Sequence, residues 1–245
     1  MARCHPLLER SKMSTTDTPL PVVHRETFSR LATALSALTK AASAGFGADC
    51  MGHAKLAQAI LLQEGISTRL VAGAAAWRIG PGTGDVISHL PTRQDLANAS
   101  SNAFPYHAWL EWDGNILDFS THSLGSKAKQ LDAQDGGTTT VNWCPLYLLL
   151  TPDQVRSMED VAQAESFGLA FYHEIPGFLE FLLTRGLREA ISDVDLSLLR
   201  YTFDNPSLNV FGPNDSIFTQ DAGEPVASSP RPVPYSEPIV RSTSG

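Results

Sequence analysis

Residues 106–120 constrain the fold of this chain more than any other segment, because they predict a β-hairpin of fixed register. Two runs rich in aromatic and branched residues flank the dipeptide Asp113-Gly114, which two-residue hairpin turns prefer. If these two residues form the turn, Trp109 lies opposite Asp118 on the neighbouring strand. The segment therefore predicts two adjacent strands of an antiparallel sheet.

One face of this hairpin carries an imidazole and a carboxylate. Side chains alternate along a strand, which places four residues on one face: His107, Trp109, Asp118 and Ser120. His107 and Asp118 are diagonal neighbours, roughly 7 to 8 Å apart between backbones, and their side chains can close that gap. The carboxylate then orients one ring nitrogen and leaves the other for a thiol. Glu111 shares the face as a rival carboxylate, and the alternative interpretation is a solvated polar surface.

Cys50 is the candidate nucleophile because it opens a predicted helix that runs to about Glu64. Asp49 is placed to cap this helix and Gly65 to end it. Unpaired backbone N–H groups and the positive end of the helix dipole favour a thiolate at such a position. The glycine-rich approach at 45–47 leaves room for a substrate, and the Cys50 amide can help to hold an oxyanion. The alternative is a small buried hydrophobic side chain, which is the usual role of a free cysteine.

The rest of the chain predicts further helices and strands around this hairpin. Apolar residues at steps of three or four predict helices, and short apolar runs predict strands. The predicted helices cover 26–42, 152–170, 175–184 and 193–201, and the predicted strands cover 66–77, 86–89 and 141–149. Polar connections are predicted at 80–105 and 125–140. We expect residues 1–21 to be a flexible arm, residues 22–205 one domain, and residues 206–245 a disordered Pro- and Ser-rich tail.

Composition narrows the functional classes. The 245 residues carry a net charge of −8 and lack the basic cluster that binding to nucleic acid or anionic lipid needs. The apolar runs fall far short of the roughly 20 residues that span a bilayer. We therefore expect neither a nucleic-acid partner nor a membrane partner. Three widely spaced cysteines and the lack of a signal-peptide core near the N-terminus favour a reducing compartment, so we expect a cytoplasmic protein.

Three phrases of this sequence, taken in order, resemble a known family. They are Asp49-Cys50-Met51-Gly52-His53-Ala54-Lys55-Leu56-Ala57, then Gly65-Ile66-Ser67-Thr68-Arg69-Leu70-Val71-Ala72-Gly73, then His107-Ala108-Trp109-Leu110-Glu111-Trp112 with Leu117-Asp118. Over about residues 45–120 the chain resembles the transglutaminase-like core, including uncharacterised bacterial members. The resemblance implies the papain-like α+β fold, with Cys50 as nucleophile, His107 as general base and acid, and Asp118 as the orienting residue.

The match to this family has two departures. Ser67 stands where the family phrase has proline, and no glutamine shortly precedes Cys50 of the kind that papain-like enzymes use to hold the oxyanion. Backbone amides are then the default oxyanion donors, and Asn102 is a side-chain candidate. Trp109, beside His107, is a candidate wall of the substrate cleft.

The sequence predicts neither a metal site nor a cofactor. Several potential ligands are present, but no Cys-x-x-Cys, His-Glu-x-x-His or calcium-loop spacing joins them. These potential ligands are His53, His89, His107, His122 and Cys144. The glycine-rich run at 80–84 lacks the following Lys-Ser or Lys-Thr of a phosphate-binding loop.

These observations predict an α+β domain in which helix 50–64 packs on an antiparallel sheet, with Cys50 over the face of His107 and Asp118. The predicted activity is acyl transfer from a peptide, protein or other amide substrate. Water is favoured over an amine as acceptor because no second-substrate site is evident. The competing hypothesis is a catalytically inactive binding or regulatory module of the same fold, its cleft filled by loop 80–105 or by the tails. The sequence leaves the oligomeric state open.

Overall fold

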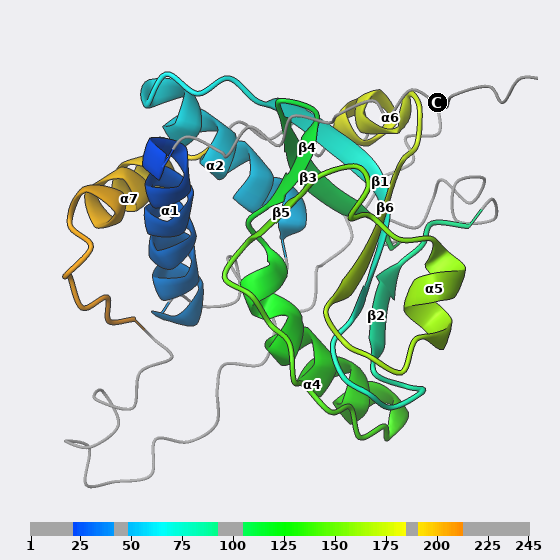
Figure 1. Ribbon diagram of the computed structural model, residues 1–245. Helices are drawn as coiled ribbons and strands as arrows, with labels where there is room; N and C mark the ends of the chain where they lie inside the picture. Colours follow the sequence, from blue (N-terminus) through cyan, green and yellow to red (C-terminus); the bar gives the residue numbers. More distant parts are fainter. Residues whose placement is uncertain (1–21, 42–48, 93–104, 185–190, 213–245) are drawn as a thin grey trace, which may run out of the picture.

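The computed structural model describes residues 22–41, 49–92, 105–184 and 191–212, which form an α+β fold around a curled antiparallel sheet (Figure 1). The predicted arm at 1–21, the glycine-rich approach at 45–47, Asn102 and most of the predicted tail lie outside these residues. The helices are α1 (Val22–Ala41), α2 (Cys50–Gln63), the 3-10 helix η1 (Thr121–Ser123), α4 (Leu124–Asp135), α5 (Met158–Gln163), α6 (Phe178–Thr184) and α7 (Asp193–Asp204). The strands are β1 (Arg69–Arg78), β2 (Val86–His89), β3 (His107–Trp112), β4 (Asn115–Asp118), β5 (Leu148–Leu150) and β6 (Leu169–Glu174).

Strand β1 is the centre of the sheet. Its first half pairs with β3, from Arg69 opposite Glu111 to Gly73 opposite His107, and its second half pairs with β2. Strand β6 lies along the other edge of β1, where Gly73 faces Glu174. From β3 the sheet continues through β4 to β5, and every one of these pairs is antiparallel.

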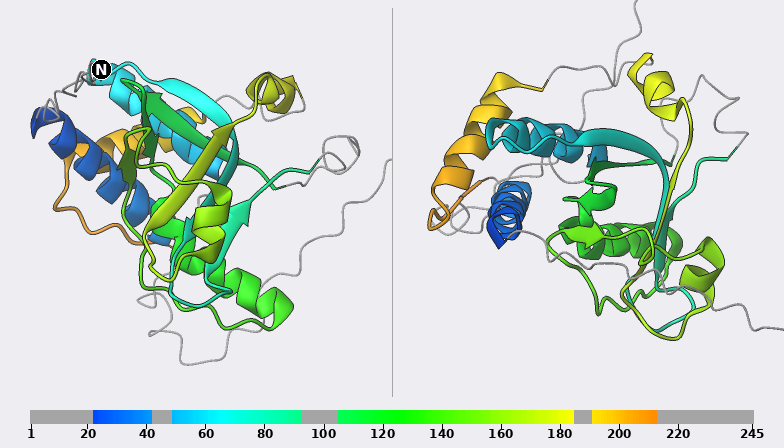
Figure 2. Two further views of the ribbon diagram at one scale, coloured as in Figure 1. Left: turned by 45° about the vertical axis from the view of Figure 1, so that its right-hand side comes forward. Right: turned by 45° about the horizontal axis from the view of Figure 1, so that its top comes forward.

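The core has two parts, one on each face of the sheet. Helices α1, α2 and α7 lie together on one side (Figures 1 and 2), and their apolar stripes pack against the inner residues of β3 and β4. The predicted stripe of α1 is confirmed, because Phe28, Leu31, Leu35 and Leu38 are all buried. The other face carries large aromatic side chains and part of α4: Trp77, Trp109, Tyr172, Leu124 and Ala128. N-terminal helices packed on an antiparallel sheet are therefore confirmed.

The hairpin has the predicted turn and register. Asp113 and Gly114 form the turn with φ angles of 49° and 73°, the left-handed backbone that this turn type requires. Leu110 pairs with Leu117 and Trp112 with Asn115, which is the register that a two-residue turn imposes. Asp118 is the last residue of β4, so the carboxylate and His107 lie near the same end of the hairpin.

Two predictions for the second half of the chain are wrong. Residues 125–140 were expected to be a polar loop, but α4 covers Leu124–Asp135, because Leu124 and Ala128 anchor one side of an otherwise polar helix. The predicted helix at 152–170 is reduced to the six residues of α5, which a capping box at Ser157 begins. The residues after it form β6, whose pairing with distant β1 outweighs the local helical pattern.

Smaller differences concern element length. The predicted strand at 141–149 is present only as the three residues Leu148–Leu150, and α6 and α7 fall within or close to their predicted ranges. Among the described residues, none of the helices combines the length and the apolar character that crossing a membrane would require.

Candidate active site

Helix α2 places Cys50 at its N-terminal end. The carboxylate of Asp49 accepts a hydrogen bond from the backbone N–H of Gly52 at 2.9 Å, so the predicted cap is confirmed. Buried residues on one side of the helix, Ala57 and Leu61 among them, attach it to the core. Cys50 is only half-buried, so the sulfur lies where the helix dipole is positive and where the surface is near.

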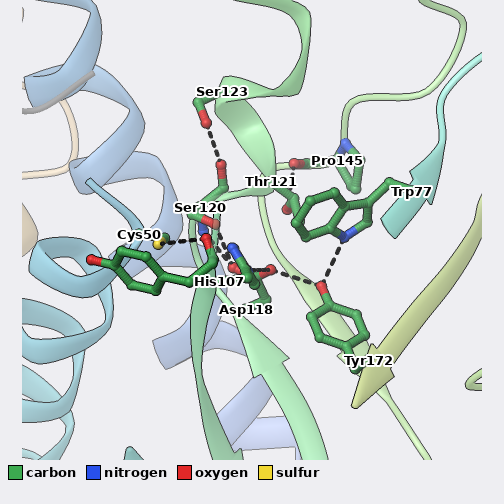
Figure 3. A network of polar contacts seen from close by, with 10 residues as sticks. Cys50, Trp77, His107, Asp118, Ser120, Thr121, Ser123, Pro145 and Tyr172 are labelled. Atoms are coloured by element: carbon green, nitrogen blue, oxygen red, sulfur yellow. Dashed lines mark hydrogen bonds and ion pairs between the residues drawn. The ribbon is translucent and has the colours of Figure 1, made fainter. Parts of the chain in front are cut away.

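The direction from which Cys50 approaches His107 differs from the prediction. Helix α2 does not cover the face of β3 that carries His107. It packs with Ala108 and Leu110 on the opposite face, whereas His107 and Trp109 share the face of Trp77. Figure 3 shows Cys50 and the Trp77–Tyr172 pair on opposite sides of strands β3 and β4, which carry His107 and Asp118.

The thiol reaches the imidazole around the start of β3. Because β3 begins at His107, no further residue of the strand lies between the helix end and the ring. The Cys50 sulfur lies 3.9 Å from the backbone carbonyl oxygen of Tyr106, the residue before His107, and the thiol is close enough to the His107 ring to raise the pKa of that ring. The thiol and the imidazole, which belong to opposite faces of the sheet, thus meet at the first residue of β3.

His107 and Asp118 form the predicted pair. Nε2 of His107 lies 2.8 Å from Oδ2 of Asp118, and the two side chains are 3% and 1% exposed. The rival carboxylate of Glu111 is half-exposed and bound to Arg69, which also contacts Glu174 at 2.6 Å. The side chain that orients the imidazole is therefore Asp118.

Asp118 accepts hydrogen bonds on both of its oxygens. Oδ1 accepts from the backbone N–H of Ser120 at 2.8 Å and from its hydroxyl at 2.7 Å. Oδ2, the oxygen that faces His107, also accepts from the hydroxyl of Tyr172 at 2.7 Å. The indole N–H of Trp77 in turn donates to the Tyr172 oxygen at 2.9 Å (Figure 3). A buried carboxylate with this many donors is held in one orientation.

The sequence did not indicate Trp77 and Tyr172 as site residues. Tyr172 belongs to β6, which begins within the segment 152–170 where a helix was expected. In sequence it lies 95 residues from Trp77. No local pattern around either residue points to a shared hydrogen bond. Alternation along 169–174, with Ala170 and Tyr172 buried, is the one signal that would have indicated a strand here.

The charges of the pair stabilise one another. Burial by itself would lower the pKa of His107, but the charge and hydrogen bond of Asp118, together with Cys50, outweigh burial and raise it. Burial would raise the pKa of Asp118, but the charge and hydrogen bond of His107, with the donors Ser120 and Tyr172, hold it below its usual range. The pair is therefore an imidazolium and a carboxylate at neutral pH.

Aromatic rings surround the imidazole. Trp109, the predicted wall of the cleft, is 2% exposed and stacks on His107 with ring centroids 6.1 Å apart, so it supports the ring from within the core. His89 lies on the more exposed side, 5.8 Å from His107 between ring centroids. Burial, with the nearby His107 charge, lowers the pKa of His89 to about 4.

A second pair of histidines lies one turn of α2 beyond Cys50. The rings of His53 and His122 are 5.3 Å apart between centroids, and Thr39 contacts His53 at 3.3 Å. Cys144 donates from its sulfur to the carbonyl oxygens of Thr121 and His122, at 3.4 and 3.3 Å. Within the ranges that the structure describes, no three His, Cys, Asp or Glu side chains are grouped so as to hold a metal ion.

Comparison with known proteins assigns no family to this chain. No family model matches it, and no curated protein matches it. A crystal structure described by a genomics target code is similar over 73% of this chain and 78% of that chain, with 15% sequence identity and a TM-score of 0.45. Similarity of this extent assigns neither a fold family nor a function.

Proposed function

We propose that this protein is a cysteine-dependent acyl-transfer enzyme with a papain-like, transglutaminase-like core. Cys50 is the nucleophile, His107 the general base and acid, and Asp118 the residue that orients His107. The observation that supports this most is the chain of contacts from the half-buried thiol through the imidazole to a buried carboxylate. A thiol at a helix N-terminus, joined to an imidazole with its own orienting acceptor, has the parts that nucleophilic catalysis needs.

The reaction follows from the two nitrogens of His107. Nε2 is held by Asp118, which leaves Nδ1 to hold the proton that the Cys50 thiol has given up, so the resting site is a thiolate beside the imidazolium. The thiolate attacks the carbonyl carbon of an amide, and the C–N bond of the tetrahedral intermediate breaks as Nδ1 returns its proton to the leaving amine. His107 then removes a proton from water or from an amine, whose attack releases the acyl group and restores the thiolate beside the imidazolium.

Two groups beside Cys50 are suited to stabilise the oxyanion. The first is the backbone N–H of Cys50, at the positive end of α2. The second is the hydroxyl of Tyr106, whose pKa is raised by burial and by the neighbouring negative groups of Cys50 and Asp49. A phenol that keeps its proton can donate a hydrogen bond to developing negative charge.

The proposal is tested by the reactivity of Cys50 in the full chain. In a Cys4→Ser background, iodoacetamide labelling of Cys50 and Cys144 is measured by mass spectrometry between pH 5.5 and 9. We expect Cys50 to react at pH 6, where an ordinary thiol with a pKa of about 8.5 is almost entirely protonated. His107→Ala should remove that advantage, and Cys50→Ser identifies the labelled site.

The opposite result is equally clear. If Cys50 and Cys144 follow the same pH profile, or if His107→Ala leaves Cys50 as reactive as before, the protein is better described as an inactive binding module. If Cys50 is activated, an acyl-directed activity-based probe followed by a peptide library identifies the substrate and decides between water and an amine as acceptor.

A further inference from the structure

Oδ2 of Asp118 has two partners that compete for its negative charge. His107 contacts it through Nε2 at 2.8 Å and the Tyr172 hydroxyl donates to it at 2.7 Å. Tyr172 is 7% exposed and Asp118 is 1% exposed, so water does not mediate or replace either contact. In such surroundings each hydrogen bond changes the charge that the other partner experiences.

Trp77 fixes Tyr172 as the donor in this contact. The Trp77 indole is a donor only, and its N–H points at the Tyr172 oxygen from 2.9 Å. The Tyr172 oxygen therefore accepts from Trp77 and uses its one proton on Asp118. A hydroxyl that accepts one hydrogen bond donates a stronger one, so Trp77 strengthens the contact between Tyr172 and Asp118.

The charge on Oδ2 sets how tightly His107 holds its proton. A more negative oxygen stabilises the imidazolium, which helps to form the Cys50 thiolate but makes the imidazolium a poorer acid toward a leaving amine. An enzyme that needs both steps requires an imidazolium of intermediate acidity. A neutral donor on the same oxygen withdraws part of its charge without adding a second cation to the site.

Resting on the acyl-transfer function proposed above, we propose that Tyr172, supported by Trp77, is a positioning residue that limits the charge of Asp118 and so keeps His107 able to return its proton to the leaving group. Tyr172 acts through Asp118 and touches neither the sulfur nor the imidazole nitrogens. Burial and the Asp118 charge raise the pKa of Tyr172 well above its usual value, so the donor stays protonated across the working range of pH.

The other titratable groups around the pair do not supply this effect. Cys50 approaches His107 from α2 and His89 approaches it from β2, whereas His122, in η1, is near enough to Asp118 for the two charges to interact. The pKa of His89 and that of His122 are each lowered to about 4, mainly by burial, so both rings are neutral near pH 7. Among the described residues, Tyr172 and Ser120 are the neutral donors to Asp118, and Tyr172 alone shares the oxygen of His107.

The test is the protonation of His107, followed by NMR of protein labelled with ¹⁵N in its histidines. A Cys50→Ser background removes the thiolate, so that the titration reports the pair of His107 and Asp118. Tyr172→Phe keeps the ring and removes the hydroxyl. We expect the deprotonation midpoint of His107 to rise by roughly half to one pH unit, because one buried hydrogen bond is worth about 1 kcal/mol.

Trp77→Phe is the second variant, and it keeps the proposal testable if Tyr172→Phe fails to fold. It should move the midpoint in the same direction by a smaller amount, because the hydroxyl remains but loses its support. Ser120→Ala is the matched control, since it removes a donor from Oδ1 rather than Oδ2 and should move the midpoint less than Tyr172→Phe. An unchanged or lowered midpoint in the Tyr172 and Trp77 variants overturns the proposal.

A second readout separates this inference from the proposed function. With Cys50 restored, the rates of Cys50 acylation by phenyl acetate and p-nitrophenyl acetate are compared, because the phenolate needs a proton to leave and the nitrophenolate does not. Tyr172→Phe should lower the rate with phenyl acetate, divided by the rate with p-nitrophenyl acetate, about two- to threefold. Labelling of Cys50 by iodoacetamide at pH 6 should persist in this variant. If Cys50 of the unsubstituted protein does not react with iodoacetamide at pH 6, the proposed acyl-transfer function is wrong. If Cys50 reacts but Tyr172→Phe leaves the ratio of rates unchanged, the role of Tyr172 is wrong.

Discussion

Asp49 accepts a hydrogen bond from the backbone N–H of Gly52, and this 2.9 Å contact fixes the turn of helix that begins with Cys50. The side chain therefore has two effects on the thiol: its cap orders the turn, and it places a carboxylate on the residue next to Cys50. The two effects oppose each other, because an ordered helix end favours a thiolate and a nearby carboxylate disfavours it.

Asp49→Asn and Asp49→Ala separate these effects. Asparagine keeps the cap and removes the charge, so Cys50 should react faster with iodoacetamide at pH 7 than in the unsubstituted protein. Alanine removes both the cap and the charge. We expect the alanine variant to be about 1 kcal/mol less stable than the asparagine variant and its Cys50 to react more slowly than Cys50 of the asparagine variant. Urea denaturation and labelling kinetics measure the two quantities, and equal stability of the two variants would show that the cap has no energetic role.

Asp118→Asn should be strongly destabilising although it changes few atoms. Whichever way the amide is turned, its NH₂ group meets a donor, either from Ser120 or from His107 and Tyr172. We expect the free energy of unfolding to fall by about 3 to 5 kcal/mol, as when one member of a buried ion pair is removed. Ser120→Ala, which removes a single hydroxyl donor, should cost only about 1 kcal/mol. Similar losses in the two variants would mean that the pair with His107 contributes little.

Acid should destabilise the fold before the carboxylates titrate. Burial lowers the pKa of both His89 and His122 to about 4, below the 6.5 of an unfolded histidine. Their neutral forms are favoured in the folded state, so the stability they contribute is complete above pH 6.5 and is lost as the pH falls toward 4. In this window each histidine adds up to about 1.4 kcal/mol per pH unit to the slope of the unfolding free energy.

The histidine contribution is measured by urea denaturation at a series of pH values. His122→Phe should reduce the slope between pH 6.5 and 4, because it removes one group that binds a proton only on unfolding. His173→Gln, at an exposed position on β6, is the matched control for the loss of a histidine. A slope that is the same in the His122 variant would assign the acid sensitivity to other groups.

Gly73 is a position where β1 has no room for a side chain. A Cβ atom there would lie 2.1 Å from the backbone carbonyl oxygen of His173, and backbone cannot move aside as a flexible side chain can. Gly73→Ala should therefore push β6 away from β1 beside Tyr172, with a loss of about 1 to 3 kcal/mol in stability. Gly84→Ala, at a position with no atom within 4 Å, should change stability by less than about 0.5 kcal/mol. Thermal unfolding of the two variants compares them directly.

The hairpin and the start of α2 were predictable because local chemistry determines them. The left-handed turn at Asp113 and Gly114 sets the register, and the cap at Asp49 sets the first residue of the helix. With these two features known, the sequence alone indicated that His107 and Asp118 share a face and that Cys50 opens a helix.

The rest of the site depends on contacts between distant parts of the chain. β6 is a strand because β1 offers it an edge, so Tyr172 could not be assigned to the site from its neighbours in sequence. The side from which Cys50 approaches depends on which face of β3 helix α2 packs against, which the pattern of residues in α2 does not encode. Helix α4 was missed because its buried stripe is narrow, with Leu124 and Ala128 in a segment of mostly polar residues.

The two-residue turn has a consequence for the site. Surface loops usually tolerate insertions and deletions, but an insertion between Trp112 and Asn115 that shifted the pairing by one residue would move every later residue of β4 to the opposite face. Asp118 would then point into the apolar layer beneath the helices instead of toward the imidazole. The register of this turn therefore constrains the site as much as the carboxylate does, whereas the turn side chains are constrained only by the left-handed backbone.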